Sequence, residues 1–170
     1  MLVSARSFNI RLWPCLTCLL ALLALGQVLQ TPCLTLSAGE RRLAMYEARP
    51  GLVLTIDFIH SVQKTPVREV LAVEQGGGSL ELIETRYRSF GVGLPFLESE
   101  GDFRQEGSDF VLCGMERHFP GLSLRTGVGT QLTLTVSGLG QMEQVFPLYE
   151  EFLPGTRIDV RLQPLYEVIF

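Results

Sequence analysis

The segment Phe58–Val70, FIHSVQKTPVREV, concentrates the side chains of this sequence that could carry acid–base chemistry. It contains His60, one of two histidines, and Lys64, the only lysine, together with Ser61 and Glu69. A histidine beside a serine offers a base next to a nucleophile, and a histidine beside a glutamate offers an oriented imidazole. The apolar residues on both sides predict that these side chains are carried by a β-hairpin.

The position of Pro66 predicts how this hairpin turns. Proline lacks the N–H that a central strand needs, so we expect the chain to reverse just before it, with Val62 paired to Val67 across a four-residue loop. Counting along both strands then places His60 opposite Glu69, at about 4.5–5.5 Å between their Cβ atoms. A carboxylate there would favour the protonated imidazole and fix the orientation of its ring.

Strand geometry argues against a catalytic triad within this segment. His60 and Ser61 are neighbours, so on a strand they point to opposite faces and cannot share a proton. The sequence has no G-x-S-x-G nucleophile elbow and no cysteine or histidine spacing typical of a metal site. We therefore predict no catalytic residue, no metal and no cofactor, and keep a hydrolase of unknown substrate as an alternative. A second alternative is purely structural, with Glu69 satisfying His60 inside an assembly module that has no ligand.

A second polar cluster, ETRYRSFGVGLP, follows a glycine-rich turn. Strand alternation separates its charged side chains from its neutral ones. Glu84, Arg86 and Arg88 share one face, and Thr85, Tyr87 and Ser89 share the other. One register places Arg86 beside Glu69, and a slip of one residue places Tyr87 there. Gly91 and Gly93 allow a tight turn, or the close approach of a ligand, at the strand end.

Composition sets limits on the class of protein. The chain has 170 residues, of which 46% are hydrophobic and 19% charged, so it can build the core of a single domain. The formal net charge is −4, and no basic patch is present. We therefore expect no nucleic-acid partner.

The N-terminal segment resembles an export signal. Two arginines precede an uncharged apolar stretch that ends in the small residues Ala24 and Gly26. This order is typical of a secretory signal peptide, so we predict a signal peptide at residues 1–26 and a single β-rich domain at residues 27–170. An uncleaved inner-membrane anchor is the alternative, because the apolar run extended to Leu29 approaches the roughly 17–25 residues of a membrane helix.

Removal of the signal peptide would leave two cysteines, Cys33 and Cys113. In an oxidising compartment outside the cytoplasm, two such cysteines are a candidate disulfide. Two buried, unpaired thiols are the alternative, because only the distance between the two residues decides.

Short apolar runs alternate with turn residues at intervals of roughly 8–12 residues, which is typical of an all-β protein. We predict a small antiparallel sandwich or a half-open barrel. The expected strands are Leu34–Ser37, Leu43–Glu47, Leu52–Val62, Val67–Glu74, Leu80–Phe90, Phe110–Glu116, Leu122–Arg125, Gln131–Val136 and Arg157–Leu162. Gly140–Phe152 is the one segment that could hold a short helix, and Pro147 interrupts it.

The strings HSVQKTPVREV and ETRYRSFGVGLP resemble a family of small bacterial envelope proteins classed as a domain of unknown function. The resemblance covers His60–Val70 and Glu84–Pro95, and more loosely residues 34–125. Genes of that family commonly lie beside TAXI-type TRAP transporters, which import solutes from the periplasm. The resemblance implies the cell envelope as location and, as partner, a TRAP membrane component or a TAXI solute receptor. It assigns no reaction, so no catalytic role carries over.

These observations predict an envelope accessory protein of a TAXI-type TRAP importer that binds the solute, its receptor or the membrane component. The expected site is the face with His60, Glu69, Arg86 and Tyr87, bordered by Lys64. Ser61, Glu84, Ser89, Gly91 and Gly93 complete the predicted binding set. Arginine and lysine there would suit a small organic anion such as a carboxylate.

Overall fold

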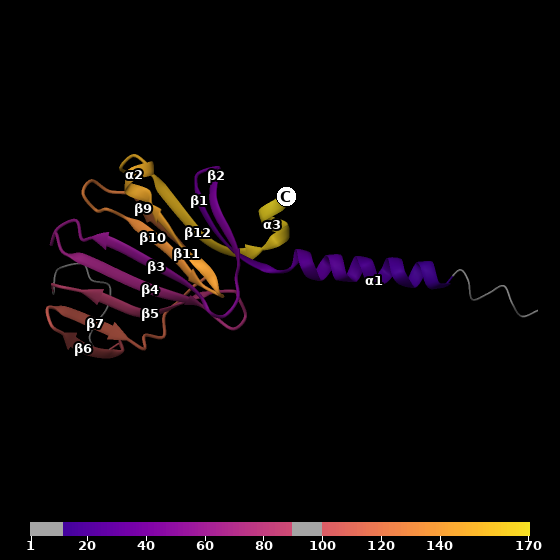
Figure 1. Cartoon of the computed structure of the whole chain (residues 1–170), viewed down its shortest axis with the longest axis horizontal. Coiled ribbons are helices and arrows are strands. Elements are labelled where there is room, and N and C mark those ends of the chain that lie inside the picture. Colours follow the sequence, from indigo (N-terminus) through magenta and orange to yellow (C-terminus); the bar gives the residue numbers. More distant parts are fainter. Residues whose placement is uncertain (1–11, 90–99) are drawn as a thin grey trace, which may run out of the picture. The chain divides into compact units, whose positions relative to one another are not determined.

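A computed structural model describes residues 12–89 and 100–170. The chain divides into two compact units. Residues 32–163 make up the larger one, and the described part of residues 1–31 joins residues 164–170 in the other. Figure 1 traces the elements along the chain.

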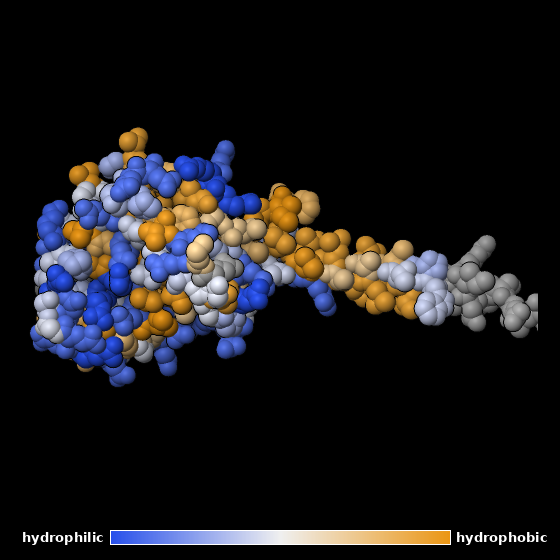
Figure 2. All heavy atoms as spheres, viewed as in Figure 1, coloured by the Kyte–Doolittle hydropathy of each residue, from blue (hydrophilic) through white to orange (hydrophobic). Residues whose placement is uncertain are grey.

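The smaller unit consists of helix α1 (Leu12–Leu29) and the short helix α3 (Leu165–Ile169). The backbone N–H of Leu165 donates a hydrogen bond to the carbonyl oxygen of Thr31 at 2.9 Å. The surface of α1 is largely hydrophobic (Figure 2), and its leucines between Leu16 and Leu25 are exposed. Within the described ranges, none of the helices combines the length and hydrophobicity needed to cross a bilayer. The assignment of residues 1–26 as a signal peptide or an anchor stays a prediction.

The larger unit is all-β, as the sequence predicts. Its strands form antiparallel sheets that do not close into a barrel. A four-stranded sheet has the order β2-β1-β12-β9, and an eight-stranded sheet has the order β11-β10-β3-β4-β5-β7-β6, with β8 paired to β5. The strands are β1 (Pro32–Ala38), β2 (Arg41–Glu47), β3 (Leu52–Ile59), β4 (Pro66–Val73), β5 (Leu80–Tyr87), β6 (Asp102–Glu106), β7 (Asp109–Cys113), β8 (His118–Phe119), β9 (Gly121–Arg125), β10 (Thr133–Gly138), β11 (Gln141–Pro147) and β12 (Arg157–Pro164).

Alternating side chains of both sheets build one hydrophobic core. Leu52, Leu54 and Ile56 of β3 are buried in it at every second position, as the period of a strand requires. Strands of the other sheet contribute Leu34 and Val160 in the same manner. The alternate residues of β3 point to the opposite face and are less buried. Burial of one set in the core therefore determines which residues of β3 face outward.

A bulge in β5 changes this alternation within one strand. Val70 pairs with Glu84, but the next residue of β4, Leu71, pairs with Leu82, so Ile83 has no partner on β4. Before the bulge Leu82 points to the core, and after it Thr85 does. Without the extra residue, the charged side chains of the second polar cluster would point into the core.

The segment Gly140–Phe152, which could hold a short helix, contains one only after Pro147. Residues 141–147 form the edge strand β11, which pairs with β10, and only α2 (Leu148–Glu151) is helical. Pro147 ends the strand, because it has no N–H for a further ladder bond, and α2 begins after it. Strands β6 and β8 are additions that the sequence pattern did not indicate.

The hairpin between β10 and β11 yields a test of the fold. Gly138 has φ +102°, and a Cβ atom there would clash with the carbonyl oxygen of Gly51. Gly140 has φ +70°, and no heavy atom lies within 4 Å of a Cβ placed there. We expect Gly138→Ala to lower the free energy of unfolding by about 3 kcal/mol, against about 1 kcal/mol for Gly140→Ala. Urea unfolding of both variants measures this difference, and equal losses would contradict the close approach.

Candidate functional site

The predicted hairpin forms between β3 and β4, and residues 60–65 make up its turn. Strand β3 ends at Ile59, and the N–H of His60 donates to the carbonyl oxygen of Thr65 at 2.8 Å. The Nδ1 atom of His60 accepts hydrogen bonds from the backbone N–H groups of Val62 and Gln63 at 3.3 and 3.1 Å. The imidazole therefore satisfies the backbone of its own turn, in the way that Asn and Asp side chains do in turns.

The predicted register of this hairpin is wrong, because the turn takes up residues that we assigned to strands. In the structure Glu69 pairs with Ile56, and Val67 with Phe58. His60 and Glu69 are thus not cross-strand partners. The partner of Glu69 on β5 is Thr85, so neither of the two registers that we considered for that strand pair is correct.

The predicted adjacency of the two polar clusters is nevertheless correct. They lie on the neighbouring strands β4 and β5. The hydroxyl of Ser89 also donates to the side-chain oxygen of Gln63 at 2.5 Å, which links the end of the second cluster to the turn of the first.

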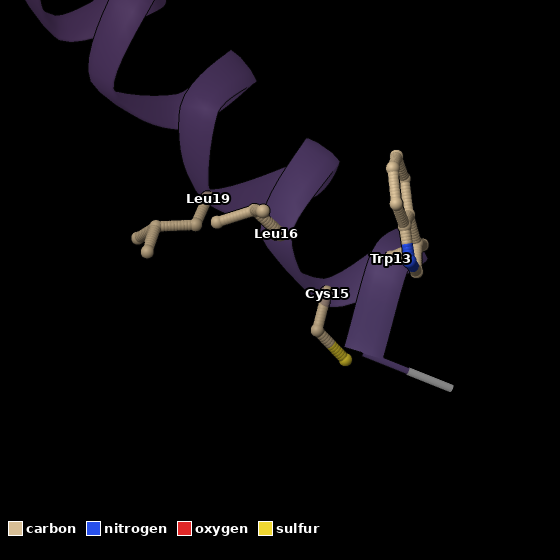
Figure 3. A pocket seen from close by; sticks show the side chains of 4 residues that line it. All are labelled: Trp13, Cys15, Leu16 and Leu19. Atoms are coloured by element: carbon tan, nitrogen blue, oxygen red, sulfur yellow. The ribbon is translucent and has the colours of Figure 1, made fainter. Parts of the chain in front are cut away.

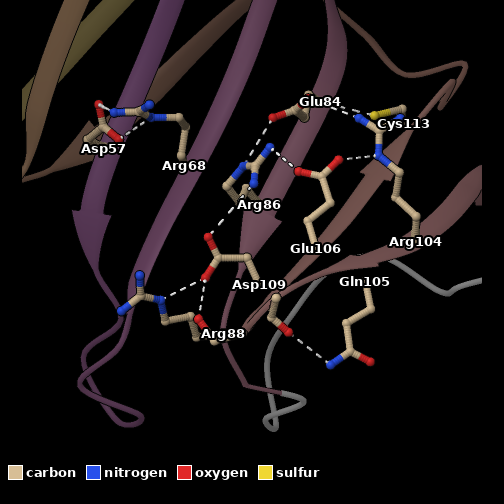
Figure 4. A network of polar contacts seen from close by, with 12 residues as sticks. Asp57, Arg68, Glu84, Arg86, Arg88, Arg104, Gln105, Glu106, Asp109 and Cys113 are labelled. Atoms are coloured by element: carbon tan, nitrogen blue, oxygen red, sulfur yellow. Dashed lines mark hydrogen bonds and ion pairs between the residues drawn. The ribbon is translucent and has the colours of Figure 1, made fainter.

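Eight charged side chains lie on the outward face of the large sheet, over β3 to β7, and are called here the charged face (Figure 4). They are Asp57, Arg68, Glu84, Arg86, Arg88, Arg104, Glu106 and Asp109. Strand register brings them together, because Asp57 pairs with Arg68, and Arg68 with Arg86. Arg86 in turn pairs with Val111, and Val111 with Arg104.

Arg86 is the centre of this network. Its guanidinium lies 2.9 Å from Glu106, 3.4 Å from Glu84 and 3.8 Å from Asp109. The hydrogen bond to Glu106 is the main cause that raises the pKa of Arg86. One guanidinium thus contacts carboxylates from three strands.

The other three arginines each have a carboxylate partner as well. Arg68 donates two hydrogen bonds to Asp57, at 2.7 and 3.2 Å, and Arg88 donates to Asp109 at 2.7 Å. The bond from Arg88 is the main cause that lowers the pKa of Asp109. Arg104 lies 2.8 Å from Glu106.

The charged face is therefore neutral as a set, with four arginines against four carboxylates. A depression of about 200 Å³ lies within it, between Arg68, Arg86 and Arg88, with Asp57 and Asp109 at its sides. Arg68 and Arg86 are direct cross-strand partners, and like charges in that position repel each other. The arrangement can recognise charged groups.

The remaining predicted site residues fall outside this network. Ser61 and Lys64 are exposed in the turn, where Lys64 has φ +55°. Tyr87 is buried, with its ring centroid 5.8 Å from that of Phe110, and it lines the depression beside Arg86. Gly91 and Gly93 lie outside the described residues.

The candidate disulfide between Cys33 and Cys113 is absent from the structure, in which both residues are thiols, and this is the alternative that the sequence left open. Cys33 is buried in β1 of the small sheet, whereas Cys113 lies in β7 of the large one, and no disulfide joins them. The Cys113 thiol donates to Glu84 at 3.8 Å, at the border of the charged face. Among the described residues no group of three His, Cys, Asp or Glu side chains could hold a metal ion.

Glu69, a predicted site residue, points to the opposite side of the sheet, toward the core. It shares the inward alternation of Val67 and Leu71, and burial raises the pKa of its carboxyl. Within the part of the chain that the structure describes, no hydrogen bond or ion pair reaches this carboxyl. A carboxyl that loses water without gaining a partner is costly for the folded state.

A hollow of about 510 Å³ lies on α1, lined by Trp13, Cys15, Leu16 and Leu19 (Figure 3). A single helix lines it, so it is an open apolar surface without a polar group to orient a ligand. We therefore do not assign a site to it.

The sequence was compared with known protein families, curated proteins and solved structures. A family model described as Domain of unknown function (DUF1850) matches residues 54–140. The chain belongs to this family. No curated protein and no solved structure matches the chain significantly.

The matched region spans β3 to β10 and so includes every residue of the charged face as well as Glu69. Sequence analysis identified Glu84 and Arg86 but missed the acidic residues that β6 and β7 supply. The alternation in DFRQE could have indicated a strand, but not which strand it would pair with.

Arg86→Met tests the central place of this residue in the network. We expect the free energy of unfolding to fall by about 1 kcal/mol at low salt, because three carboxylates lose their shared cation. The loss should shrink in 1 M NaCl, where charges are screened within about 3 Å. The control is Arg157→Met on β12, whose cation contacts Asp159 two residues away. An equal, salt-independent loss in both variants would contradict the network.

Glu69→Gln tests the cost of the inward carboxyl through the pH dependence of stability. The folded-state pKa of Glu69 is raised above its ordinary value of 4.5. Its contribution is therefore favourable below that value and is lost as pH rises through the folded-state pKa. We expect wild type to lose stability relative to Glu69→Gln as pH increases from 4 to 8, measured by urea unfolding. The exposed Glu143→Gln is the control, and a parallel pH profile for all three proteins would refute the prediction.

Proposed function

We propose that this chain is a cell-envelope accessory protein of a TAXI-type TRAP solute importer. The charged face is its docking surface for a protein component of that importer. The resemblance of the two motifs supports the transporter association, and membership of the family is in line with it. The positively charged start and apolar N-terminal segment support export to the periplasm.

The observation that carries the docking proposal is the density of paired charges on one sheet face. Exposed ion pairs stabilise a fold by only about 0–1 kcal/mol each. The core on the other face of the same strands already supplies the main stabilisation. Four arginines and four carboxylates, partly exposed and held in register, are therefore better explained by recognition of a partner.

A docking role fits this surface better than capture of a small anion. Each arginine already has a carboxylate within 4 Å, so a free carboxylate solute would have to displace Asp57 or Asp109. A protein partner can instead add its own charges around the existing pairs without breaking them. The depression between Arg68 and Arg86 keeps an organic anion as the second candidate, because an anion there would relieve the repulsion between the two cations.

The test is binding of the purified chain to the TAXI solute receptor and to the TRAP membrane component from the same source organism. We expect one of them to bind wild type and Arg157→Met equally, and Arg68→Met/Arg86→Met at least about tenfold more weakly, a change of about 1.4 kcal/mol. Thermal unfolding confirms that the variants are folded. Solute uptake in cells lacking the chain, complemented with each variant, should follow the same order.

Other results would point to other functions. A rise in melting temperature with carboxylate solutes, lost in the double variant, would favour the small-anion site. Absence of binding to both transport proteins, together with unchanged uptake, would refute the proposal and leave the charged face with a structural role.

A further inference from the structure

A cavity of about 240 Å³ opens between the two sheets at the inward end of Glu69. Its walls come from β3 and β4 of the large sheet, from β9 of the small sheet, and from the segment that precedes β10. The lining residues are Ile56, Phe58, Glu69, Leu124, Arg125, Thr130 and Leu132. The wall is thus mainly apolar, and it is separate from the charged face, because Glu69 points inward.

Glu69 is the polar group of this wall that lacks a partner. The hydroxyl of Thr130 donates to the carbonyl oxygen of Gly127 at 3.0 Å, and the guanidinium of Arg125 donates to that of Gly155 at 3.1 Å. Burial is the single cause that raises the pKa of Glu69, and none of the described cations lowers it.

A second polar group without a partner lies beside Glu69. Thr85 is its cross-strand neighbour on β5 and is 0% exposed. Its hydroxyl has no hydrogen-bond partner in the described structure. Buried polar atoms are nearly always hydrogen-bonded, so this hydroxyl is an exception among the described residues. Glu69 beside it is only partly buried, and its side chain lines the cavity.

We propose that this cavity binds a small amphiphile with an apolar body and a cationic head, and that the Glu69 carboxylate accepts hydrogen bonds from the head. An ammonium group supplies both the charge and the donors that Glu69 lacks. The apolar body is held by the side chains of Phe58, Leu124 and Leu132. A volume of about 240 Å³ lies below the usual range of roughly 300–1,000 Å³ for drug-sized ligands, so the ligand is small.

The charge of the head follows from the electrostatics of the wall. An anionic head would face the carboxylate in a poorly hydrated place, where like charges repel strongly. Arg125 lines the same wall, but its guanidinium is exposed to solvent, which screens its charge, and it does not contribute to the pKa shift of Glu69. A neutral alcohol would satisfy Glu69 as a hydrogen-bond donor, but without the attraction of opposite charges.

The test compares three probes of equal chain length, hexylammonium, hexanol and hexanoate, by titration calorimetry on the full-length chain at pH 7.5. We expect hexylammonium to bind wild type at least about tenfold more tightly than hexanol, and hexanoate not to bind. Glu69→Gln should bind hexylammonium at least about tenfold more weakly than wild type, whereas Glu143→Gln should bind it equally. Leu124→Trp fills the cavity from β9 and should abolish binding of all three probes.

Defined results overturn the proposal. Equal affinity of hexylammonium for wild type and Glu69→Gln would show that the carboxylate does not hold the head. Tighter binding of hexanoate than of hexylammonium would reverse the assigned charge. Binding that survives Leu124→Trp would place the ligand elsewhere, and absence of binding by every probe would reject the cavity as a site. If Glu69→Gln does not fold, the probe series on wild type and Leu124→Trp still decides.

Discussion

The bulge at Ile83 is the constraint on which both faces of the large sheet depend. One extra residue in β5 shifts the strand alternation, so that Leu82 and Thr85 both face the core. Glu84 and Arg86 are turned outward by the same shift. Because side chains alternate with a period of two, no smooth strand could place an apolar pair before this point and a charged pair after it on the correct sides.

The charged face follows from this local irregularity. Outward-turned arginines on β5 meet carboxylates that β6 and β7 deliver from a distant part of the sequence, and Arg86 contacts three of them. The ion pairs hold the guanidinium groups in defined places at little cost or gain in stability. A surface of this kind is organised before a partner arrives, which lowers the entropy lost on docking.

Glu69 occupies an inward-facing position of β4 at which a carboxyl is less favourable for the folded state than an apolar side chain. An apolar side chain would fill its place between Val67 and Leu71 without the cost of burying a carboxyl. Proteins keep such costly groups where a function needs them, and titratable side chains in an apolar cavity are a recurring sign of a binding site. The unsatisfied hydroxyl of Thr85 beside it strengthens this reading. The charged face and the cavity are therefore two separate features on opposite sides of β4.

The sequence by itself determined the all-β class, the positions of the expected strands and the alternation of Glu84 and Arg86 against Thr85 and Tyr87. These properties depend on local patterns of side chains and turn residues, which neighbouring residues carry. Only the tertiary structure decided that His60 closes its own turn, that Glu69 faces the cavity, and that Arg86 meets Glu106. Register depends on where a turn ends and a bulge falls, and a shift of a few residues changes every partner across the sheet. The pairing of β5 with β7 is likewise set by the packing of the whole core, which no short segment of the sequence encodes.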